Sequence, residues 1–560
     1  MKTTRSVQKR MSLPDWERLP LAKQIAQMIV VRASGYLFDH QIQYPQWEPP
    51  ADILRDRIQE LGVGGVILLG GSAAEVGVRS RQLQDWASIP LLIAADIEEG
   101  VGQRFAGATW FPPPMAIAAL PNQSDFLPTD AARQMGAITA QEALAIGINW
   151  LLAPVVDVNN NPQNPVINVR SFGETAAIVC ELAIAFLQGA QQHPILTTAK
   201  HFPGHGDTAT DSHLDLPILP HPLDRLTEVE FPPFQAAIAN NVDAVMTAHL
   251  QIPALDTEYP ATLSHRILTG ELRQRLGFEG LIVTDALIMG AIANRYGADE
   301  AAVMAIDAGV DILLMPPDPE GAIHAICQAI ETGRITIDRI QASLERIWRS
   351  KRNVCFPAVA DNPHAWETVP PPIRLEHLAQ PNAIATATHI LHGSQKIHRP
   401  TQNRIDRTRR SLSLRNLILL DSVIGSGFLT LNTPAITLPQ QWGYHLQIID
   451  RYTPPISLDA TTDTHPTLLQ LFIRGNPFRG SADLTQIAQD WFTFLLETDR
   501  LQALVIYGSP YVLDPFLPQL PPDIPYVFTY GQMAAAQAIA LETLFSETTQ
   551  PIQLNQIFTD

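Results

Sequence analysis

The chain has 560 residues, a formal net charge of −18 and a hydrophobic content of 46%. A negative protein is repelled by nucleic-acid phosphates and by anionic lipids, so this charge disfavours both as partners. The length exceeds that of one ordinary domain. No apolar run approaches the ~18 residues of a membrane-spanning helix, and the N-terminus lacks the apolar segment of a secretory signal. Together with three widely separated cysteines that show no disulfide or metal-ligand spacing, this predicts a cytoplasmic globular protein.

Short apolar runs rich in β-branched residues recur through the first part of the chain, with helix-compatible sequence between most of them. The eight runs cover residues 28–31, 65–69, 91–96, 149–157, 195–201, 244–250, 281–285 and 311–316. Alternating strands and helices predict a parallel sheet, and eight such units can close into a barrel. We therefore expect an α/β fold whose N-terminal domain, residues 1–355, is a TIM-like (β/α)8 barrel.

Titratable side chains stand at or just before the ends of these runs. They are Asp96, Asp157, Lys200, His201, His249 and Asp285. The carboxyl ends of barrel strands converge on one face, where barrel enzymes place their active sites. One aspartate at a strand end is more often a helix cap, so the prediction depends on the number of these groups and on the loop that begins at Lys200.

That loop reads KHFPGHGDTATDSH over residues 200–213. Pro203, Gly204 and Gly206 exclude a regular helix or strand, so a shaped loop is expected directly after a buried strand. Metal binding is a second interpretation of its titratable residues, but their irregular spacing matches no zinc pattern, and we expect no metal. The residues concerned are His201, His205, Asp207, Asp211 and His213.

The C-terminal third of the chain predicts a second domain. Residues 356–412 are rich in proline, histidine and polar residues and are interpreted as a linker with a helix-like stretch. From 413 to 560 five apolar runs alternate with amphipathic segments, which predicts a smaller open αβα sandwich. These runs lie near 417–421, 446–450, 468–473, 503–507 and 526–530. No glycine-rich nucleotide-binding loop follows any of them, and no cofactor is expected.

Two groups have the chemistry of a glycoside-cleaving pair. Asp285 follows a buried strand without a charged neighbour in sequence, which suits a nucleophile or general base. His213 lies two residues after Asp211, so in an extended loop the carboxylate can orient the imidazole and raise its pKa. One group that attacks and one that donates a proton are the parts of a double-displacement glycoside hydrolysis.

The loop KHFPGHGDTATDSH resembles the signature loop of the β-N-acetylhexosaminidase branch of glycoside hydrolase family 3. The likeness covers most of the chain and continues in the order expected for that family. It is carried by ADIEEGVGQRF (95–105), LAPVVDVNNNPQNPVINVRSFG (152–173), AVMTAHLQIPALD (244–256), PATLSHRILTGELRQRLGFEGLIVTDALIMGAI (260–292), AGVDILLMPPD (308–318) and ALVIYGSPYVL (503–513).

The resemblance implies Asp285 as the catalytic nucleophile, His213 as the acid/base and Asp211 as its orienting partner. It also implies a set of substrate-binding residues: Asp96, Arg170, Lys200, His201, Met246 and His249. On the residues alone, Arg170 fits a structural ion pair with Glu174 equally well, and His249 fits a buried core histidine. The segment DIEEGVGQR differs from the DQEGGRVQR usual in the peptidoglycan-recycling group, since Val101 stands where an arginine is expected.

The function implied is that of a retaining exo-β-N-acetylglucosaminidase acting on small carbohydrates, either simple glycosides or peptidoglycan fragments. A histidine base is neutral and does not repel phosphate, so a β-N-acetylglucosaminide phosphorylase is a physically allowed alternative. A β-glucosidase of the broader family is another. From a different class, the alternative is a non-catalytic glycan-binding protein that keeps the fold.

Overall fold

The computed structural model describes residues 13–122, 126–208, 216–355, 372–400, 413–454, 465–474 and 482–545. The chain divides into two compact units, and the change from the first to the second falls between Ile390 and Leu391. Much of the predicted linker lies outside the described residues, so the predicted domain limits stay predictions. In the described ranges, no helix has the length and apolarity that a bilayer crossing requires.

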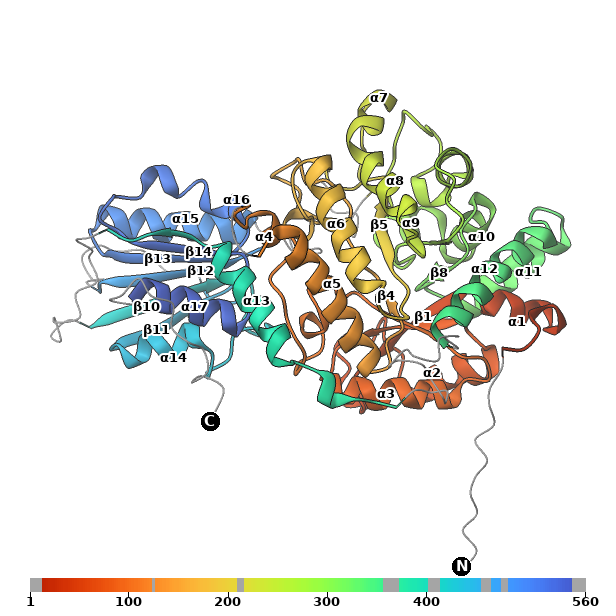
Figure 1. The fold of residues 1–560 in the computed structure, drawn as a ribbon, viewed down its shortest axis with the longest axis horizontal. Helices are drawn as coiled ribbons and strands as arrows, with labels where there is room; N and C mark the ends of the chain where they lie inside the picture. The colour runs from red at the N-terminus through yellow and green to blue at the C-terminus, as the bar shows by residue number, and fades with distance from the viewer. Residues whose placement is uncertain are drawn as a thin grey trace, which may run out of the picture. The chain divides into compact units, whose positions relative to one another are not determined.

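The described residues of the first unit hold eight parallel strands, of which Figure 1 labels β1, β4, β5 and β8. The strands are β1 (Ile29–Ser34), β2 (Gly65–Leu69), β3 (Leu92–Ala95), β4 (Trp150–Leu151), β5 (Thr198–Phe202), β6 (Ala244–Thr247), β7 (Leu281–Val283) and β8 (Leu313–Leu314). Their ladders form two arcs, β4-β3-β2-β1-β8 and β5-β6-β7. Isolated parallel bridges join β4 to β5 and β7 to β8, at Trp150–Leu196, Val155–Lys200 and Val283–Ile312. The strands therefore neighbour one another in chain order around a ring, which confirms the predicted barrel-like α/β fold.

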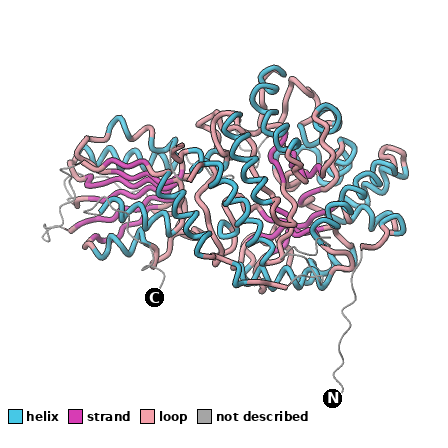
Figure 2. The backbone as a smooth tube through the Cα atoms, in the orientation of Figure 1, coloured by secondary structure: helices cyan, strands magenta, loops and turns pink. Residues whose placement is uncertain are grey.

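Helices lie between the strands of the first unit and around them (Figures 1 and 2). They are α1 (Leu21–Ala26), α2 (Ala51–Asp56), α3 (Ala73–Trp86), α4 (Met115–Ala118), α5 (Pro128–Ala145), α6 (Ala176–Ala190), α7 (Leu223–Arg225), α8 (Phe231–Ala239), α9 (Gly290–Tyr296), α10 (Ala298–Ala308), α11 (Pro319–Glu331), α12 (Ile337–Cys355) and α13 (Pro381–Gly393). The first helix, α1, precedes β1, and the last, α13, runs from this unit into the second. Local chemistry sets several of their starts. Ser72 and Glu75 form a capping box at α3, and the Asp318 carboxylate accepts hydrogen bonds from two backbone amides at the start of α11.

One predicted strand is much shorter than expected. The run at 149–157 forms a ladder only over Trp150–Leu151, and Val155 then pairs with Lys200 through a single bridge. Pro154 stands between these two contacts, and a proline has no amide hydrogen to donate to a ladder. The residues beyond it form a loop rather than a strand, which brings Asp157 to the same end of the barrel.

The second unit holds a six-stranded sheet in the order β11-β10-β12-β13-β14-β9. The strands are β9 (Lys396–His398), β10 (Leu414–Leu420), β11 (Tyr444–Ile449), β12 (Thr467–Ile473), β13 (Leu501–Gly508) and β14 (Tyr526–Thr529). The five predicted strands are confirmed and run parallel. β9 is not among them; it pairs antiparallel with β14 at one edge.

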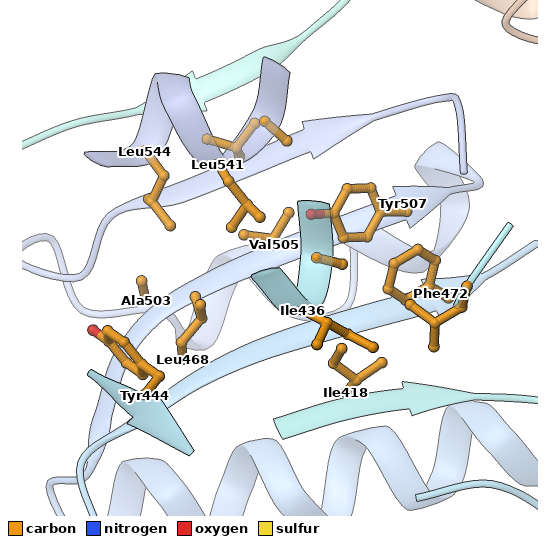
Figure 3. Packing of buried hydrophobic residues seen from close by; sticks show 14 of the residues in the cluster. Ile418, Ile436, Tyr444, Leu468, Phe472, Ala503, Val505, Tyr507, Leu541 and Leu544 are labelled. Carbon is orange, nitrogen blue, oxygen red and sulfur yellow. The ribbon is translucent and has the colours of Figure 1, made fainter. Parts of the chain in front are cut away.

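Helices cover both faces of this sheet, α15 on one and α14 and α17 on the other (Figure 1). Their bounds are α14 (Pro434–Gln441), α15 (Ala482–Glu497), α16 (Pro510–Leu513) and α17 (Ala534–Phe545). Figure 3 shows the apolar core between the sheet and the helices α14 and α17. The rings of Phe472 and Tyr507 stack there with centroids 4.3 Å apart, and the Tyr507 hydroxyl donates to Gln470 at 2.9 Å. The buried hydroxyl is thus satisfied inside the core.

Candidate active site

The candidate site residues occupy the carboxyl ends of five barrel strands. Asp96 follows β3, Asp157 follows the bridge after β4, Lys200 and His201 lie in β5, and Asp285 comes two residues after β7. Met246 is a buried residue of β6, and His249 comes two residues after that strand. Because parallel strands end on one face of a barrel, these groups share one mouth. Asp211 and His213 lie outside the described residues.

Lys200 is the centre of a buried charge cluster. Its Nζ atom donates to Asp96 Oδ1 at 2.7 Å and pairs with Glu98 Oε1 at 2.6 Å. The Lys200 and Glu98 side chains are only 1% and 4% exposed, whereas that of Asp96 is 36% exposed. The cluster therefore presents the Asp96 carboxylate to the outside and holds the lysine behind it.

Arg170 completes this cluster from the far side of Glu98. Its guanidinium donates from Nε and Nη2 to the two Glu98 oxygens, at 2.8 and 2.7 Å, and from Nη1 to the Val166 carbonyl at 3.0 Å. Such two-point pairing fixes both position and plane of the guanidinium. Arg170 belongs to a short 3-10 helix, Asn168–Arg170, in the loop after β4.

Glu98 is a residue of the candidate site that the sequence analysis did not predict. The available signal is its position two residues after Asp96, since residues at that spacing in an extended segment point to the same side. It is also the second acidic group in the stretch 96–99, which contains three. The sequence allowed Arg170 to form a structural ion pair with Glu174. In the structure, the residue that pairs with Arg170 through two hydrogen bonds is Glu98.

The positive and negative groups of this cluster keep one another ionised. Burial raises the pKa of Glu98, but the positive charges of Arg170 and Lys200 outweigh burial and hold that pKa well below its usual value. Burial lowers the pKa of Lys200, but the charges of Asp96 and Glu98 outweigh it and raise the pKa overall. The lysine and the glutamate are therefore both ionised at neutral pH.

Asp157 orients the two histidines that begin the loop. It accepts a hydrogen bond from Nδ1 of His201 at 2.8 Å and another from the backbone amide of His205 at 2.7 Å. Since Nδ1 of His201 donates to the carboxylate, Nε2 is the ring nitrogen that remains for a further hydrogen bond. Burial raises the pKa of Asp157, yet the charge and hydrogen bond of His201 bring it below the usual value.

His205 itself is a neutral histidine at ordinary pH. Burial lowers its pKa to about 4, against smaller opposing effects of the charges of Asp157 and Asp285. Its Nδ1 atom lies 2.8 Å from the Thr208 hydroxyl, and that hydroxyl donates back to the His205 carbonyl at 3.2 Å. His205 thus shapes the loop while lying within electrostatic reach of Asp285.

The loop after β5 is held tightly up to residue 208. The Asn164 side chain donates to the carbonyls of His205 and Gly206 at 2.8 and 2.9 Å, which ties this loop to the one after β4. A Cβ atom on Gly206 would lie 1.8 Å from the Val158 carbonyl oxygen, so only glycine fits this close approach. Asp207 pairs with His221 Nε2 at 2.8 Å. The expected shaped loop is present over residues 203–208, whereas the first three residues of the predicted stretch, Lys200, His201 and Phe202, belong to strand β5.

Three of the residues considered for metal binding are described in the structure, and their side chains do not converge on one point. His201 turns to Asp157, His205 to Thr208, and Asp207 to His221. These partners hold the three side chains in separate hydrogen bonds.

Asp285 is positioned by its own backbone and by His249. One Asp285 oxygen accepts from the amide of Ala286 at 2.8 Å. His249 is fully buried, and its Nε2 atom lies 3.1 Å from the Ala286 carbonyl, which can only accept. Its Nδ1 atom lies 2.8 Å from the Thr262 hydroxyl. His249 therefore packs beneath the peptide that carries the candidate nucleophile.

Comparison with known protein families finds one match in each of the two units. The model of the glycosyl hydrolase family 3 N-terminal domain matches residues 20–350, and that of the bacterial glycosyl hydrolase family 3 C-terminal domain matches residues 407–546. Beta-hexosaminidase A of Pseudoalteromonas piscicida is 36% identical over 330 residues, which are 53% of this chain and 54% of that protein. The chain thus spans about half the length of that relative.

Two further proteins are similar over more of their own length. A beta-hexosaminidase of Nitrosomonas eutropha is 33% identical over 283 residues, 49% of this chain and 81% of that protein. The structure of a glycoside hydrolase family 3 beta-N-acetylglucosaminidase from Paenibacillus sp. str. FPU-7 aligns over 94% of this chain and 96% of that one. Its TM-score is 0.73 and its sequence identity 29%. On these matches, the chain belongs to glycosyl hydrolase family 3.

Proposed function

We propose that this protein is a retaining exo-β-N-acetylglucosaminidase, which removes a terminal β-linked N-acetylglucosamine from small carbohydrates. The observation that carries the proposal is the buried cluster around Lys200, which presents Asp96 at the same barrel mouth as Asp285. A fixed, partly exposed carboxylate beside a candidate nucleophile suits the binding of a sugar by its hydroxyl groups. The relatives named as hexosaminidases support N-acetylglucosamine as the sugar.

In the first step Asp285 attacks the anomeric carbon, and the bond from that carbon to the leaving oxygen breaks. His213, oriented by Asp211, donates its proton to the leaving oxygen, as the sequence predicts for this pair. The product is a glycosyl ester on Asp285 and a free aglycone with a hydroxyl group.

In the second step His213, now neutral, takes a proton from water as the water attacks the same carbon. The ester bond breaks, Asp285 regains its charge, and the sugar leaves with its original β configuration. During both steps Asp96 and the Nε2 atom of His201 bind sugar hydroxyls, while Lys200 and Arg170 hold the binding groups in place. Met246 and His249, which are both buried, support the pocket from behind in this proposal.

The test is product analysis with purified protein. We expect turnover of p-nitrophenyl N-acetyl-β-glucosaminide, slow or no turnover of the matching β-glucoside, and β-N-acetylglucosamine as the first anomer seen by NMR. A first product with the α configuration would contradict the retaining mechanism. Binding of the glycoside without turnover would instead favour the glycan-binding alternative, and preference for the glucoside the β-glucosidase alternative.

Phosphate addition separates hydrolysis from phosphorolysis. The same reaction is run with and without phosphate, and the products are examined for a sugar 1-phosphate. We expect free sugar in both reactions. Accumulation of the 1-phosphate would assign the protein to the phosphorylase alternative. Peptidoglycan fragments bearing terminal N-acetylglucosamine and other N-acetylglucosaminides are both candidate natural substrates, and both belong in the same panel.

A further inference from the structure

A buried carboxylate outside the charge cluster is hydrogen-bonded to the loop after β3, residues 96–111. It belongs to Glu142 on α5, which is only 1% exposed. Among the described residues it forms no ion pair. Burying a carboxylate without a cation costs free energy unless its oxygens accept hydrogen bonds, so the donors around Glu142 carry its role.

Three donors surround the Glu142 carboxylate. Oε2 accepts from the backbone amide of Thr109 at 2.9 Å, and Oε1 accepts from the Thr109 hydroxyl at 2.6 Å and from the amide of Ala379 at 2.8 Å. Burial raises the pKa of Glu142, and these hydrogen bonds offset that effect only in part. One side chain thus joins α5, the loop after β3 and the segment between α12 and α13.

Thr109 is itself bonded to an earlier part of the same loop. Its carbonyl oxygen accepts from the amide of Gly102 at 2.8 Å, and the amide of Phe111 donates to the Glu99 carbonyl, also at 2.8 Å. A Cβ atom on Gly102 would lie 2.4 Å from the Ala108 carbonyl oxygen, so the two parts of the loop are in direct contact. A shift of Thr109 is therefore passed to the start of the loop.

The start of this loop carries Asp96 and Glu98, the two carboxylates that bind Lys200. Glu98 directly precedes Glu99 in the chain, and the Arg104 side chain donates from Nε to the Asp96 carbonyl at 3.0 Å. Hydrogen bonds weaken steeply with small changes in distance and angle. A displaced loop would therefore present Asp96 poorly to a ligand.

The contact with Ala379 anchors Glu142 from a second side. Ala379 has a φ of 46°, a conformation that residues other than glycine seldom adopt and that persists only where neighbouring groups hold it. The amide of Arg374, in the same segment, donates to the Ala145 carbonyl of α5 at 2.9 Å. This second anchor makes Glu142 a fixed support for the loop rather than a group that moves with it.

We propose that Glu142 is a positioning residue for the substrate site, which fixes the loop after β3 so that Asp96 meets the sugar. The inference rests on the proposed function, because it assumes that Asp96 binds a sugar hydroxyl. Glu142 acts through Thr109 and the loop backbone and does not touch the substrate. Its loss should therefore weaken substrate binding more than the chemical step at Asp285.

The experiment measures KM and kcat for p-nitrophenyl N-acetyl-β-glucosaminide in Glu142→Gln, at a temperature where the variant is folded. Glutamine keeps the size of the side chain but replaces one acceptor oxygen with an NH2 group, which is a donor facing a donor. We expect KM to rise about tenfold, the effect of losing one hydrogen bond to a charged group, and kcat to change less than about twofold.

Asp243→Asn is the matched control. The Asp243 carboxylate accepts from the amide and the hydroxyl of Thr197, both at 2.9 Å, so its contacts resemble those of Glu142 with Thr109. Asp243 and Thr197 directly precede β6 and β5, at the amino ends of the strands and away from the mouth. Both variants should lower the melting temperature, but only Glu142→Gln should raise KM. An equal rise in KM in both variants, or no rise in Glu142→Gln, would overturn the inference.

Two substitutions of Thr109 test the same contact from the loop, and they decide the question if Glu142→Gln does not fold. Thr109→Val removes the hydroxyl donor at nearly unchanged shape, whereas Thr109→Ser keeps it. We expect KM to rise several-fold in Thr109→Val and to stay near the wild-type value in Thr109→Ser. Equal KM values in these two variants would overturn the inference while leaving the proposed function intact. Lack of turnover by the unmodified protein would instead refute the proposed function and the inference with it.

Discussion

Glu98 holds Arg170 through two hydrogen bonds, at 2.8 and 2.7 Å, and so connects the loop after β3 with the loop after β4. The same carboxylate pairs with Lys200 in β5. One buried side chain thus links three neighbouring segments of the barrel mouth. The partly exposed Asp96 depends on this arrangement, because Glu98 also holds its partner Lys200.

Replacing Glu98 with glutamine should damage both stability and activity. The change keeps the size of the side chain but leaves two buried cations with one carboxylate fewer. We expect a loss of about 3–5 kcal/mol in the free energy of unfolding, typical of removing one partner of a buried pair. Displacement of Lys200 should lower kcat/KM about 10²-fold. Denaturant unfolding and steady-state kinetics measure the two effects.

Glu181→Gln provides the comparison, because Glu181 is exposed on α6. Neither quantity should change in that variant. Wild-type stability in Glu98→Gln would contradict the supporting role assigned to Glu98.

Removing the Asp285 carboxylate should stop covalent catalysis. In Asp285→Ala we expect kcat to fall by roughly 10³-fold or more, the scale on which loss of a nucleophile acts. Azide added to this variant can occupy the vacated space and attack the anomeric carbon from the same side. Formation of an α-glycosyl azide, detected by mass spectrometry and NMR, would identify Asp285 as the nucleophile. Retention of substantial activity without azide would rule out this role.

The loop after β5 should not tolerate a side chain at Gly206. Alanine there places Cβ 1.8 Å from the Val158 carbonyl oxygen, and neither backbone can move freely because Asn164 joins the two loops. We expect a cost of about 1–3 kcal/mol in unfolding free energy, together with reduced kcat/KM. In Gly270→Ala the new Cβ would meet its nearest atom at 3.9 Å, so that variant should behave like wild type. Similar melting temperatures for the two variants would refute the argument.

His205 should make the protein less stable in mild acid. Its pKa is about 4 in the folded protein because of burial, compared with 6.5 for an ordinary histidine. Between these values the unfolded chain binds the proton more readily, so stability falls as pH decreases from 6.5 to 4, by roughly 3 kcal/mol in total.

His205→Asn should flatten this part of the profile, measured by denaturant unfolding at several pH values. The exposed His324 on α11 is the control, and His324→Asn should keep the wild-type slope. An unchanged slope in His205→Asn would show that His205 is not the group responsible.

Much of the fold is predictable because hydrophobic patterns are local. Buried parallel strands read as short apolar runs, and all eight barrel strands and five strands of the second unit are found where such runs occur. The misses have physical reasons. Pro154 shortens β4, which the run of apolar residues does not reveal, and β9 is a short, half-exposed edge strand with no apolar pattern.

The site is less predictable because its contacts join distant parts of the chain. Because the carboxyl ends of barrel strands meet on one face, the sequence predicts Asp96, Lys200 and Asp285 at one mouth, and the structure has them there. Only the folded arrangement pairs Lys200 with Asp96, or Arg170 with Glu98, across separations of 104 and 72 residues. The catalytic roles of Asp285, His213 and Asp211 stay predictions.

The two hydrogen-bonded arcs of the barrel contribute different residues to the candidate site at the barrel mouth. The three-stranded arc from β5 to β7 carries Lys200, His201 and Asp285, whereas Asp96, Glu98 and Arg170 come from the five-stranded arc or the loops that adjoin it. We expect sugar preference to change mainly through the exchange of loops on the larger arc, because such changes leave Asp285, the proposed nucleophile, unaltered on the smaller arc. Relatives with the same arrangement could then keep one reaction while they differ in the sugar they prefer.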